Sequence, residues 1–413
     1  MKYKKELDDL AIFGGAPVFD YELHVGGPNI GERARLLRRI NDILERRWLT
    51  NRGRYVQELE EKITNLIGVK HCIAMCNATI ALEIAIRALD LKGEVIIPSM
   101  TFVATAHALQ WQEITPVFCD IDPETLCIDP MQVERLITPR TTGIIGVHLF
   151  GQTCDVEALQ EIAKKRGLRL LFDAAHAFFC SREDKMVGSF GHAEVFSFHA
   201  TKFINTLEGG AVLTNDDVLA EKIRLMKNFG FKGLDNVIFL GTNGKMNEIS
   251  AAMGLTLLES LDELVDINKR NYELYRQFLS DIPGISVRDY NYNEKCNFQY
   301  IVLNVDQDIT GFSRDDLLKI LRAENVLARR YFYPGCHRME PYRSYNPNSY
   351  LLLPHTERLN QQLMQLPTGT AIGPSEIEKI CHIIKMCVQN SEALRKLLES
   401  KHEMIEITNT IEI

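Results

Sequence analysis

The sequence lacks any apolar run of membrane-spanning length, and its longest apolar stretches, such as 168–172, are the size of a strand. Its first ten residues are charged and have no apolar core, so we expect no signal peptide and a cytoplasmic protein. Basic blocks are missing too, because 47 Lys and Arg against 55 Asp and Glu give a formal net charge of −8. Neither a membrane nor a nucleic acid is therefore an expected partner.

Motifs of several other protein classes are also missing. None of the ten cysteines forms a C-x-x-C pair, which argues against a zinc ribbon or a thioredoxin-like site, and we predict no metal site. In a long chain without a signal peptide, scattered cysteines are typical of reduced core residues. No G-x-G-x-x-G follows a strand, Gly244-Lys245 lacks the other residues of a phosphate loop, and the spacing around Ser189 does not make a nucleophile elbow.

The chain does have an ordinary globular composition and a regular alternation of elements. It has 413 residues, 46% of them hydrophobic and 25% charged, and its length allows roughly two or three domains. From about residue 55, short apolar strands alternate with helices, which predicts an α/β fold around a mostly parallel sheet. After residue 284 the pattern is that of a smaller α+β unit. The predicted parts are an N-terminal segment (1–30), a large domain (31–265), a small domain (266–400) and a tail (401–413).

The individual elements follow from the hydrophobic periodicity. Strands are predicted at 73–76, 94–98, 116–119, 143–148, 168–173, 194–198, 211–214, 284–287, 298–305 and 326–332. Helices are predicted at 55–67, 78–89, 103–111, 156–166, 217–227, 248–258, 261–282, 314–323 and 374–399.

Polar residues directly after predicted strands are the first site candidates, because parallel sheets bind ligands at the carboxyl ends of their strands. Asp173 ends the apolar run 168–172, and a carboxylate there could keep a pyridinium nitrogen protonated. Lys202 precedes Glu208-Gly209-Gly210, and a lysine held in such a turn can form a Schiff base. Together they meet the needs of pyridoxal phosphate. Taken singly, a solvated lysine and a helix-capping aspartate are the alternative interpretations.

The remaining needs of that cofactor also have candidates. Asn77-Ala78-Thr79 lies at a strand-to-helix turn, where backbone N–H groups can bind a phosphate. Phe102 follows a strand end and could stack on the ring, and His176, three residues after Asp173, could approach the ring hydroxyl. The alternatives are a plain helix cap, a core aromatic residue and a buried histidine.

These residues lie in motifs that resemble the DegT/DnrJ/EryC1/StrS family of pyridoxal-phosphate-dependent nucleotide-sugar aminotransferases. The similarity extends from about residue 11 to about residue 390, through Asn77-Ala78-Thr79, 98–105, 117–122, 147–151, Asp173-Ala174-Ala175-His176, 197–202, Glu208-Gly209-Gly210 and 243–248. It implies the aspartate-aminotransferase-like fold of the pyridoxal-phosphate-dependent transferases, fold type I. It also implies a homodimer with its active sites at the subunit interface.

The resemblance assigns roles to the matching positions. Lys202 would carry the cofactor and move protons, Asp173 would pair with the ring nitrogen, and His176 would approach the ring hydroxyl, where many relatives have Gln. The other implied cofactor contacts are Phe102 at the ring, Ala78, Thr79 and Ser197 at the phosphate, and Asn243 at the phosphate of the neighbouring subunit. Two positions depart from the family: Ala78 replaces its usual glycine, and 243–246 reads Asn-Gly-Lys-Met instead of Asn-Tyr-Arg-Met.

The segment 328–342 is rich in aromatic and basic side chains, which suit a diphosphate and a stacked base or sugar but also form ordinary surface loops. It resembles the segment of relatives that aminate C4 of a dTDP-4-keto-6-deoxyhexose. We therefore predict amino transfer from L-glutamate to C4 of dTDP-4-keto-6-deoxy-D-glucose. The predicted substrate contacts are Arg330, Tyr331, Tyr333 and His337.

Three alternative functions remain. One is amination at C3 of a dTDP-3-keto-6-deoxyhexose, and another is a non-catalytic regulator that binds pyridoxal phosphate. The third is a sugar dehydratase with the same cofactor, which Lys202 disfavours because one such branch of the family has His in place of the lysine.

Overall fold

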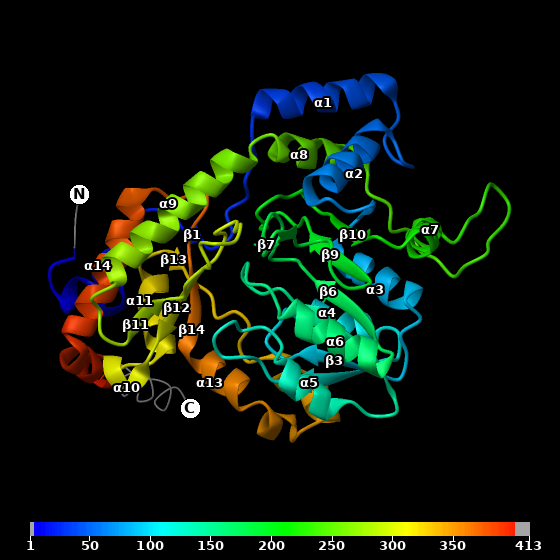
Figure 1. Cartoon of the computed structure of the whole chain (residues 1–413). Helices are drawn as coiled ribbons and strands as arrows, with labels where there is room; N and C mark the ends of the chain where they lie inside the picture. The colour runs from blue at the N-terminus through cyan, green and yellow to red at the C-terminus, as the bar shows by residue number, and fades with distance from the viewer. Residues whose placement is uncertain (1–3, 401–413) are drawn as a thin grey trace, which may run out of the picture.

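The computed structural model describes residues 4–400, so the predicted tail at 401–413 lies outside the described residues. Its central element is a seven-stranded sheet with strand order β2-β10-β9-β6-β5-β3-β4 (Figure 1). Only β10 is reversed, since it pairs antiparallel with both neighbours while the other pairs are parallel. The predicted α/β fold with a mostly parallel sheet is thus confirmed. The strands are β2 (His71–Met75), β3 (Glu94–Pro98), β4 (Thr115–Cys119), β5 (Thr141–Val147), β6 (Arg169–Asp173), β9 (Ala193–Ser197) and β10 (Gly210–Thr214).

Helices cover both faces of this sheet. Successive strand residues point to opposite faces, so each strand contributes side chains to two separate cores. In β2, Ile73 and Met75 belong to a core shared with α3, α4 and α7, whereas Cys72 and Ala74 belong to one shared with α2, α6 and α8. Burial on both faces explains why these strands are apolar at nearly every position. The helices are α2 (Arg54–Ile67), α3 (Ala78–Ala88), α4 (Ala104–Gln110), α5 (Pro130–Leu136), α6 (Val156–Arg166), α7 (Asp217–Met226) and α8 (Glu248–Leu258).

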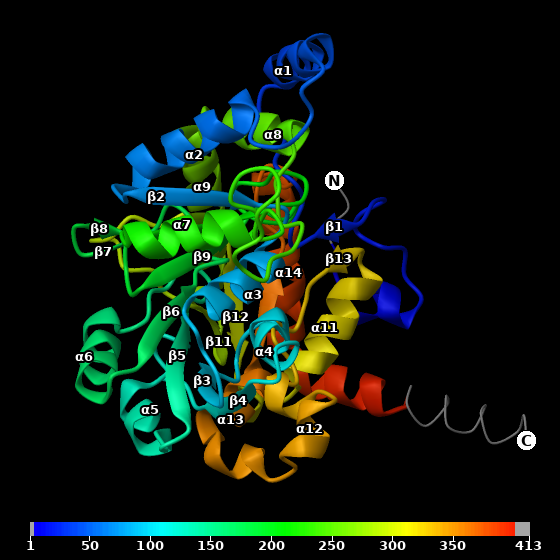
Figure 2. The same ribbon diagram turned by 90° about the vertical axis from the view of Figure 1, so that its right-hand side faces the viewer.

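The C-terminal part is built on a three-stranded antiparallel sheet of order β11-β12-β14. Helix α9 (Leu261–Leu279) connects it to the central sheet, and α14 packs along α9 (Figure 1). The N-terminal segment returns to this part, where β1 (Leu23–His24) pairs in parallel with β13 (Val326–Leu327) (Figure 2). The other elements are the hairpin β7 (Ser181–Arg182) and β8 (Lys185–Met186), then β11 (Ile285–Val287), β12 (Ile301–Val305), α10 (Gln307–Thr310), α11 (Arg314–Ala323), α12 (Tyr342–Tyr345), α13 (Pro354–Gln362), β14 (Leu363–Leu366) and α14 (Pro374–Gln389).

One predicted strand is much shorter than expected. The prediction at 326–332 is reduced to β13, because the N–H of Tyr333 donates to the carbonyl of Arg330 and the chain turns there. Between β13 and this turn, only Arg329 still bridges to a strand, through Gln365 of β14. The turn decides which side chains of this segment reach the site described below.

Helix predictions differ at several places. The short helices α5, α10, α12 and α13 were not predicted, and two further differences have a physical reason. The predicted helix 374–399 is interrupted after Gln389, where the side-chain amide of Asn390 donates to the carbonyl of Met386 at 2.9 Å, and residues 391–400 are helical again. Helix α1 (Arg33–Arg46) was not predicted, because only Ile43 of its side chains is buried and the apolar stripe is correspondingly weak. Among residues 4–400, no helix is both long and apolar enough to cross a bilayer.

Candidate active site

One cavity of about 980 Å³ lies between the carboxyl ends of the central strands and the C-terminal part. We call its lining residues from Asn77 to Gly209 the sheet wall and those from Tyr300 to Gln365 the C-terminal wall. Residues 24–28 of the N-terminal segment complete the lining. This volume is at the upper end of the range for small-molecule sites, so the cavity can hold a cofactor together with part of a substrate.

Asp173 is a buried carboxylate at the end of β6 in the sheet wall. Its Oδ2 accepts a hydrogen bond from Oγ1 of Thr105 at 2.8 Å, and its Oδ1 accepts one from the N–H of Ala175 at 3.1 Å. Burial raises the pKa of this carboxyl, while the two hydrogen bonds and the nearby Lys202 act in the opposite direction. A cationic ring nitrogen placed in the cavity would stabilise the ionised form.

Lys202 lies in the turn after β9, where its N–H donates to the carbonyl of His199 at 2.9 Å. The side chain is partly buried and lines the cavity. Burial lowers the pKa of its amine to about 8, against the attraction of Asp173. About one tenth of the amine is therefore neutral at pH 7, far more than for an exposed lysine, and only the neutral amine is a nucleophile or a base.

The ring of His176 lies among three aromatic side chains, two of them from the C-terminal wall. Its centroid lies 4.4 Å from that of Tyr300, 5.6 Å from that of Phe150 and 5.8 Å from that of Phe332. Burial, reinforced by the charge of Lys202, lowers the pKa of the imidazole well below its usual value. Since Nδ1 accepts from the N–H of Phe150 at 3.3 Å, the single proton of the neutral ring is on Nε2, where it can be donated to a ligand.

The N-terminus of α3 forms one end of the sheet wall. Asn77 caps the helix, with its Oδ1 accepting from the N–H of Ile80 at 2.8 Å. Ala78 and Thr79 begin the helix and line the cavity, together with Ser197 at the end of β9. A Cβ at Gly210 would lie 2.7 Å from the nitrogen of Ala78, so glycine there allows β10 to pass close to this turn. Helix N-termini of this kind bind phosphate.

The sheet wall therefore gathers seven of the eight predicted cofactor contacts around one cavity. They are Ala78, Thr79, Phe102, Asp173, His176, Ser197 and Lys202. Phe102 is 55% exposed, and its ring centroid lies 6.3 Å from that of Phe332 across the cavity. Asn243 is exposed and is not part of the lining, and its Oδ1 accepts from Nζ of Lys245 at 2.7 Å. Its predicted role concerns a neighbouring subunit and stays a prediction.

The predicted substrate contacts are not all placed at the cavity. Tyr331 lines it, whereas Arg330, Tyr333 and His337 do not. Because the chain turns at Tyr333, the guanidinium of Arg330 lies 4.2 Å from the centroid of the Tyr333 ring and pairs with Asp315 at 3.0 Å. His337 is 1% exposed, and its ring nitrogens bind the side chains of two other residues, Ser99 and Glu357.

The sequence analysis missed several residues of the C-terminal wall. Arg329 lines the cavity instead of its neighbour Arg330, and it is joined by Arg322, Tyr300, Phe332 and Gln365. An alternation signal was present for one of them, because Arg329 lies two residues before the predicted contact Tyr331 in the strand predicted at 326–332, so the two should share a face. Arg322, Tyr300 and Gln365 come from three other elements or loops, and no local pattern connects them.

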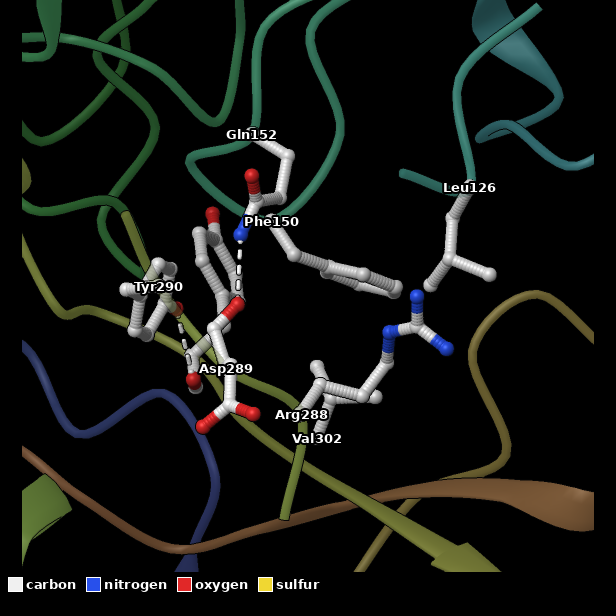
Figure 3. A pocket seen from close by; sticks show the side chains of 8 residues that line it. Leu126, Phe150, Gln152, Arg288, Asp289, Tyr290 and Val302 are labelled. Atoms are coloured by element: carbon white, nitrogen blue, oxygen red, sulfur yellow. Dashed lines mark hydrogen bonds between the residues drawn. The ribbon is translucent and has the colours of Figure 1, made fainter. Parts of the chain in front are cut away.

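Beside this cavity, a small crevice of about 10 Å³ lies between residues that follow the central strands and residues of the C-terminal part (Figure 3). Figure 3 shows the side chain of Gln152 reaching the backbone of Asp289, to whose carbonyl it donates at 2.7 Å. Nη2 of Arg288 donates to the carbonyl of Pro123 at 3.1 Å. The ring of Phe150, which lines the crevice, also stacks on Phe332 at 5.9 Å. The crevice has room for about one water molecule. The hydrogen bonds of Gln152 and Arg288 and the stacking of Phe150 on Phe332 connect the two parts of the chain around it.

A family model described as "DegT/DnrJ/EryC1/StrS aminotransferase family" matches residues 31–385. The chain is 38% identical to the dTDP-4-amino-4,6-dideoxy-D-glucose transaminase of Shigella dysenteriae, over 88% of this chain and 98% of that protein. It is 36% identical to the Escherichia coli protein of the same name, over the same shares of each chain.

Solved structures give the same result. The structure of DesI determined in the presence of its TDP-sugar product has a TM-score of 0.91 and 47% sequence identity, and the match covers 96% of this chain and all of that one. Helicobacter pylori PseC, an aminotransferase of pseudoaminic acid biosynthesis, has a TM-score of 0.82 and 28% identity, over 88% of this chain and 99% of that one. The chain belongs to the DegT/DnrJ/EryC1/StrS aminotransferase family. These matches also confirm the predicted fold of the pyridoxal-phosphate-dependent transferases, fold type I.

Proposed function

We propose that the protein is a pyridoxal-phosphate-dependent transaminase that moves the amino group of L-glutamate to C4 of dTDP-4-keto-6-deoxy-D-glucose. The family assignment supports the reaction class, and the names of the two transaminases described above support the sugar and the position. The proposal rests on one observation: Lys202, Asp173 and His176 all line the sheet wall of the same large cavity.

Pyridoxal phosphate fits the residues of the sheet wall. Lys202 supplies an amine of lowered pKa, Asp173 a buried acid, and the start of α3 a set of backbone donors for a phosphate. When bound there, the cofactor supplies an aldehyde for the lysine and an electron sink for the reaction. The apolar and aromatic surroundings of His176 keep water away from this end of the cavity.

Lys202 is the proton carrier in this proposal. Its neutral Nζ would take the α-proton of the amino donor and pass it to the carbon that bears the cofactor's aldehyde. In the second half of the reaction, it would carry a proton from that carbon to C4 of the sugar. The amine has to lose its proton to act as a base, and a pKa of about 8 makes this far easier than for an exposed lysine. Burial, the cause of that lowered pKa, is therefore directly useful to the reaction.

Asp173 and His176 act on the cofactor side. The Asp173 carboxylate is oriented by Thr105 and Ala175, so it can hold a ring nitrogen in its protonated form without reorganising. His176 keeps its proton on Nε2 and stays neutral, so it can donate a hydrogen bond to an oxygen without adding a positive charge next to Lys202.

We further infer a homodimer with active sites at the interface. Large apolar side chains are exposed on α1 and on the loop between α7 and α8, two features that project from the body in Figure 1: Leu37, Leu44, Leu234 and Leu240. Unburied groups of this size are typical of association surfaces. Asn243 lies in the same loop and would contact the neighbour's cofactor phosphate. Sedimentation analysis should find a dimer, and Leu234→Asp with Leu240→Asp should produce monomers with lower activity.

A reducing compartment such as the cytoplasm is also part of the proposal. All ten cysteines have free thiols, nine of them buried, so nothing in the fold depends on disulfides.

The test of the function is incubation of the enzyme with dTDP-4-keto-6-deoxy-D-glucose and L-glutamate, followed by mass spectrometry and NMR of the product. We expect the 4-amino-4,6-dideoxy sugar and 2-oxoglutarate in equal amounts. A nitrogen at C3, a deoxy-ketosugar without nitrogen, or cofactor binding with no turnover of any keto-sugar would each contradict the proposal and support one of the alternatives.

A further inference from the structure

The C-terminal wall carries two guanidinium groups that have no carboxylate partner within residues 4–400. Arg322, in the last turns of α11, uses Nε and Nη2 to donate to the carbonyl of Ala328, both at 3.2 Å, which leaves its other N–H groups available. The guanidinium of Arg329 lies over the ring of Tyr331 at 4.3 Å from the centroid. Both side chains line the cavity and are thus held toward it by contacts that do not neutralise their charge.

Gln365 of β14 adds a polar group that lacks a partner. It lines the same cavity but is only 4% exposed, and its Nε2 is buried without a hydrogen-bond partner. Nearly all buried side-chain amides in proteins are hydrogen-bonded, because a buried donor without an acceptor is costly. A bound acceptor would satisfy this amide.

The sheet register brings Gln365 and Arg329 together. Their backbones exchange both hydrogen bonds, at 3.1 Å and 2.7 Å, so the two residues are directly opposite each other. Side chains of directly opposed residues project from the same face of a sheet, and here that face is the cavity side. An orphaned amide donor and an unneutralised guanidinium therefore lie side by side, with Arg322 bound to the carbonyl directly before Arg329.

We propose that Arg329, Gln365 and Arg322 form a subsite of the cavity for an anionic oxygen group of a substrate, either a carboxylate of the amino donor or the diphosphate of the sugar nucleotide. Guanidinium groups match both anions with two parallel hydrogen bonds, and an amide N–H can complete the contact. The assignment rests on the proposed function for the choice of substrates, although the anion chemistry itself does not depend on it.

The two sources are separated by studying the two half-reactions in single turnovers of the holoenzyme. Arg329→Gln and Arg322→Gln should each raise the concentration of one substrate that gives half the maximal single-turnover rate, on the order of tenfold or more. Hydrogen bonds to charged groups are among the stronger ones. Weakening confined to L-glutamate identifies the carboxylate, and weakening confined to the keto-sugar nucleotide identifies the diphosphate. The control is Lys319→Gln, which removes a positive charge from an exposed position of the same helix.

A binding measurement avoids any dependence on turnover. Calorimetric titration of the holoenzyme with dTDP and, separately, with L-glutamate should show a loss of affinity in the two arginine variants for the same compound that the half-reactions identify. If the wild-type enzyme transfers no amino group but still binds one of these compounds through the arginines, the proposed function fails while the subsite stands. If neither compound loses more than about twofold in affinity in either variant, the subsite is refuted.

Gln365→Leu distinguishes a ligand-binding amide from a structural one. It removes a buried donor that has no partner in the protein, so the melting temperature should stay the same or rise while the affinity for the identified anion falls. A variant that unfolds more easily and binds both compounds as the wild type does would show that Gln365 serves the fold and would overturn its place in the subsite.

Discussion

The two walls of the cavity are built in different ways. In the sheet wall, Asp173 and Ser197 are the last residues of adjacent parallel strands, and the turn with Lys202 follows directly. The topology of the sheet alone places them together. In the C-terminal wall, Arg322, Arg329 and Gln365 come from α11, from the segment after β13 and from β14, and they meet only through tertiary pairing. We therefore expect chemistry to depend on the sheet wall and substrate choice to depend on the C-terminal wall.

The largest effect is expected in the sheet wall, at its amine. Lys202→Ala removes the group that binds the cofactor covalently and moves the proton, so kcat should fall on the order of 10⁴-fold in both half-reactions. The visible absorbance of the lysine-bound cofactor should disappear as well. Lys202→Arg is the matched control, because it keeps the positive charge but not a neutral amine, and it should be equally inactive. Turnover at the wild-type rate in either variant would remove Lys202 from the mechanism.

Asp173→Asn should have the next largest effect. The amide cannot hold a ring nitrogen protonated, so kcat should fall by about 10²–10³-fold in both half-reactions, while saturation by the sugar nucleotide changes little. Thr105→Val is the control, since it removes one hydrogen bond to the carboxylate but leaves its charge. Its loss should be about tenfold or less. Equal losses in the two variants would mean that the orientation of Asp173 matters and its charge does not.

The pH dependence tests the buried state of Lys202. With a pKa lowered to about 8, the neutral fraction of its amine rises tenfold per pH unit below that value and is nearly complete above it. The rate at which cofactor-free enzyme takes up pyridoxal phosphate, followed by stopped-flow absorbance, should therefore level off near pH 8. The same aldehyde with Nα-acetyl-lysine, whose side-chain amine is free, provides the reference, because an exposed lysine titrates near pH 10.4. An enzyme rate that still climbs tenfold per unit above pH 9 would contradict a lowered pKa.

The contrast between the walls also explains how much the sequence could predict. Alternation of apolar runs located every strand of the central sheet, and the positions after those runs contained Asp173 and Lys202, since strand ends in a parallel sheet share one edge. For 328–342 the sequence offered a composition and a family resemblance, and neither could tell Arg329 from Arg330. Which of two adjacent arginines faces a cavity depends on pairing with Gln365, a residue 36 positions away whose own sequence context carries no signal.

His337 provides a test of the same distinction within the C-terminal part. The sequence suggested a substrate contact, but the buried ring connects Ser99 to Glu357. His337→Ala should therefore lower the free energy of unfolding by about 1–3 kcal/mol, because it leaves both partners without this contact. Glu357→Ala removes the same link at its other end together with two hydrogen bonds from Arg338, so it should destabilise the protein at least as much in urea denaturation. A raised KM for the sugar nucleotide at unchanged stability would restore the role suggested by the sequence.

The smallest effect is expected for His176→Gln, which changes a residue of the sheet wall that packs against the rings of Phe150, Tyr300 and Phe332. Glutamine can also donate a hydrogen bond to a ring oxygen, and His176 is neutral because burial lowers its pKa, so no charge is lost in the exchange. One hydrogen bond of altered geometry corresponds to about 0.5–1.5 kcal/mol, so kcat should fall less than about tenfold. His176→Leu keeps the bulk, removes the donor and should lose more. If Gln and Leu were equally active, the imidazole would matter only through its stacking on Phe150, Tyr300 and Phe332, and the sheet wall would owe its chemistry to Lys202 and Asp173 alone.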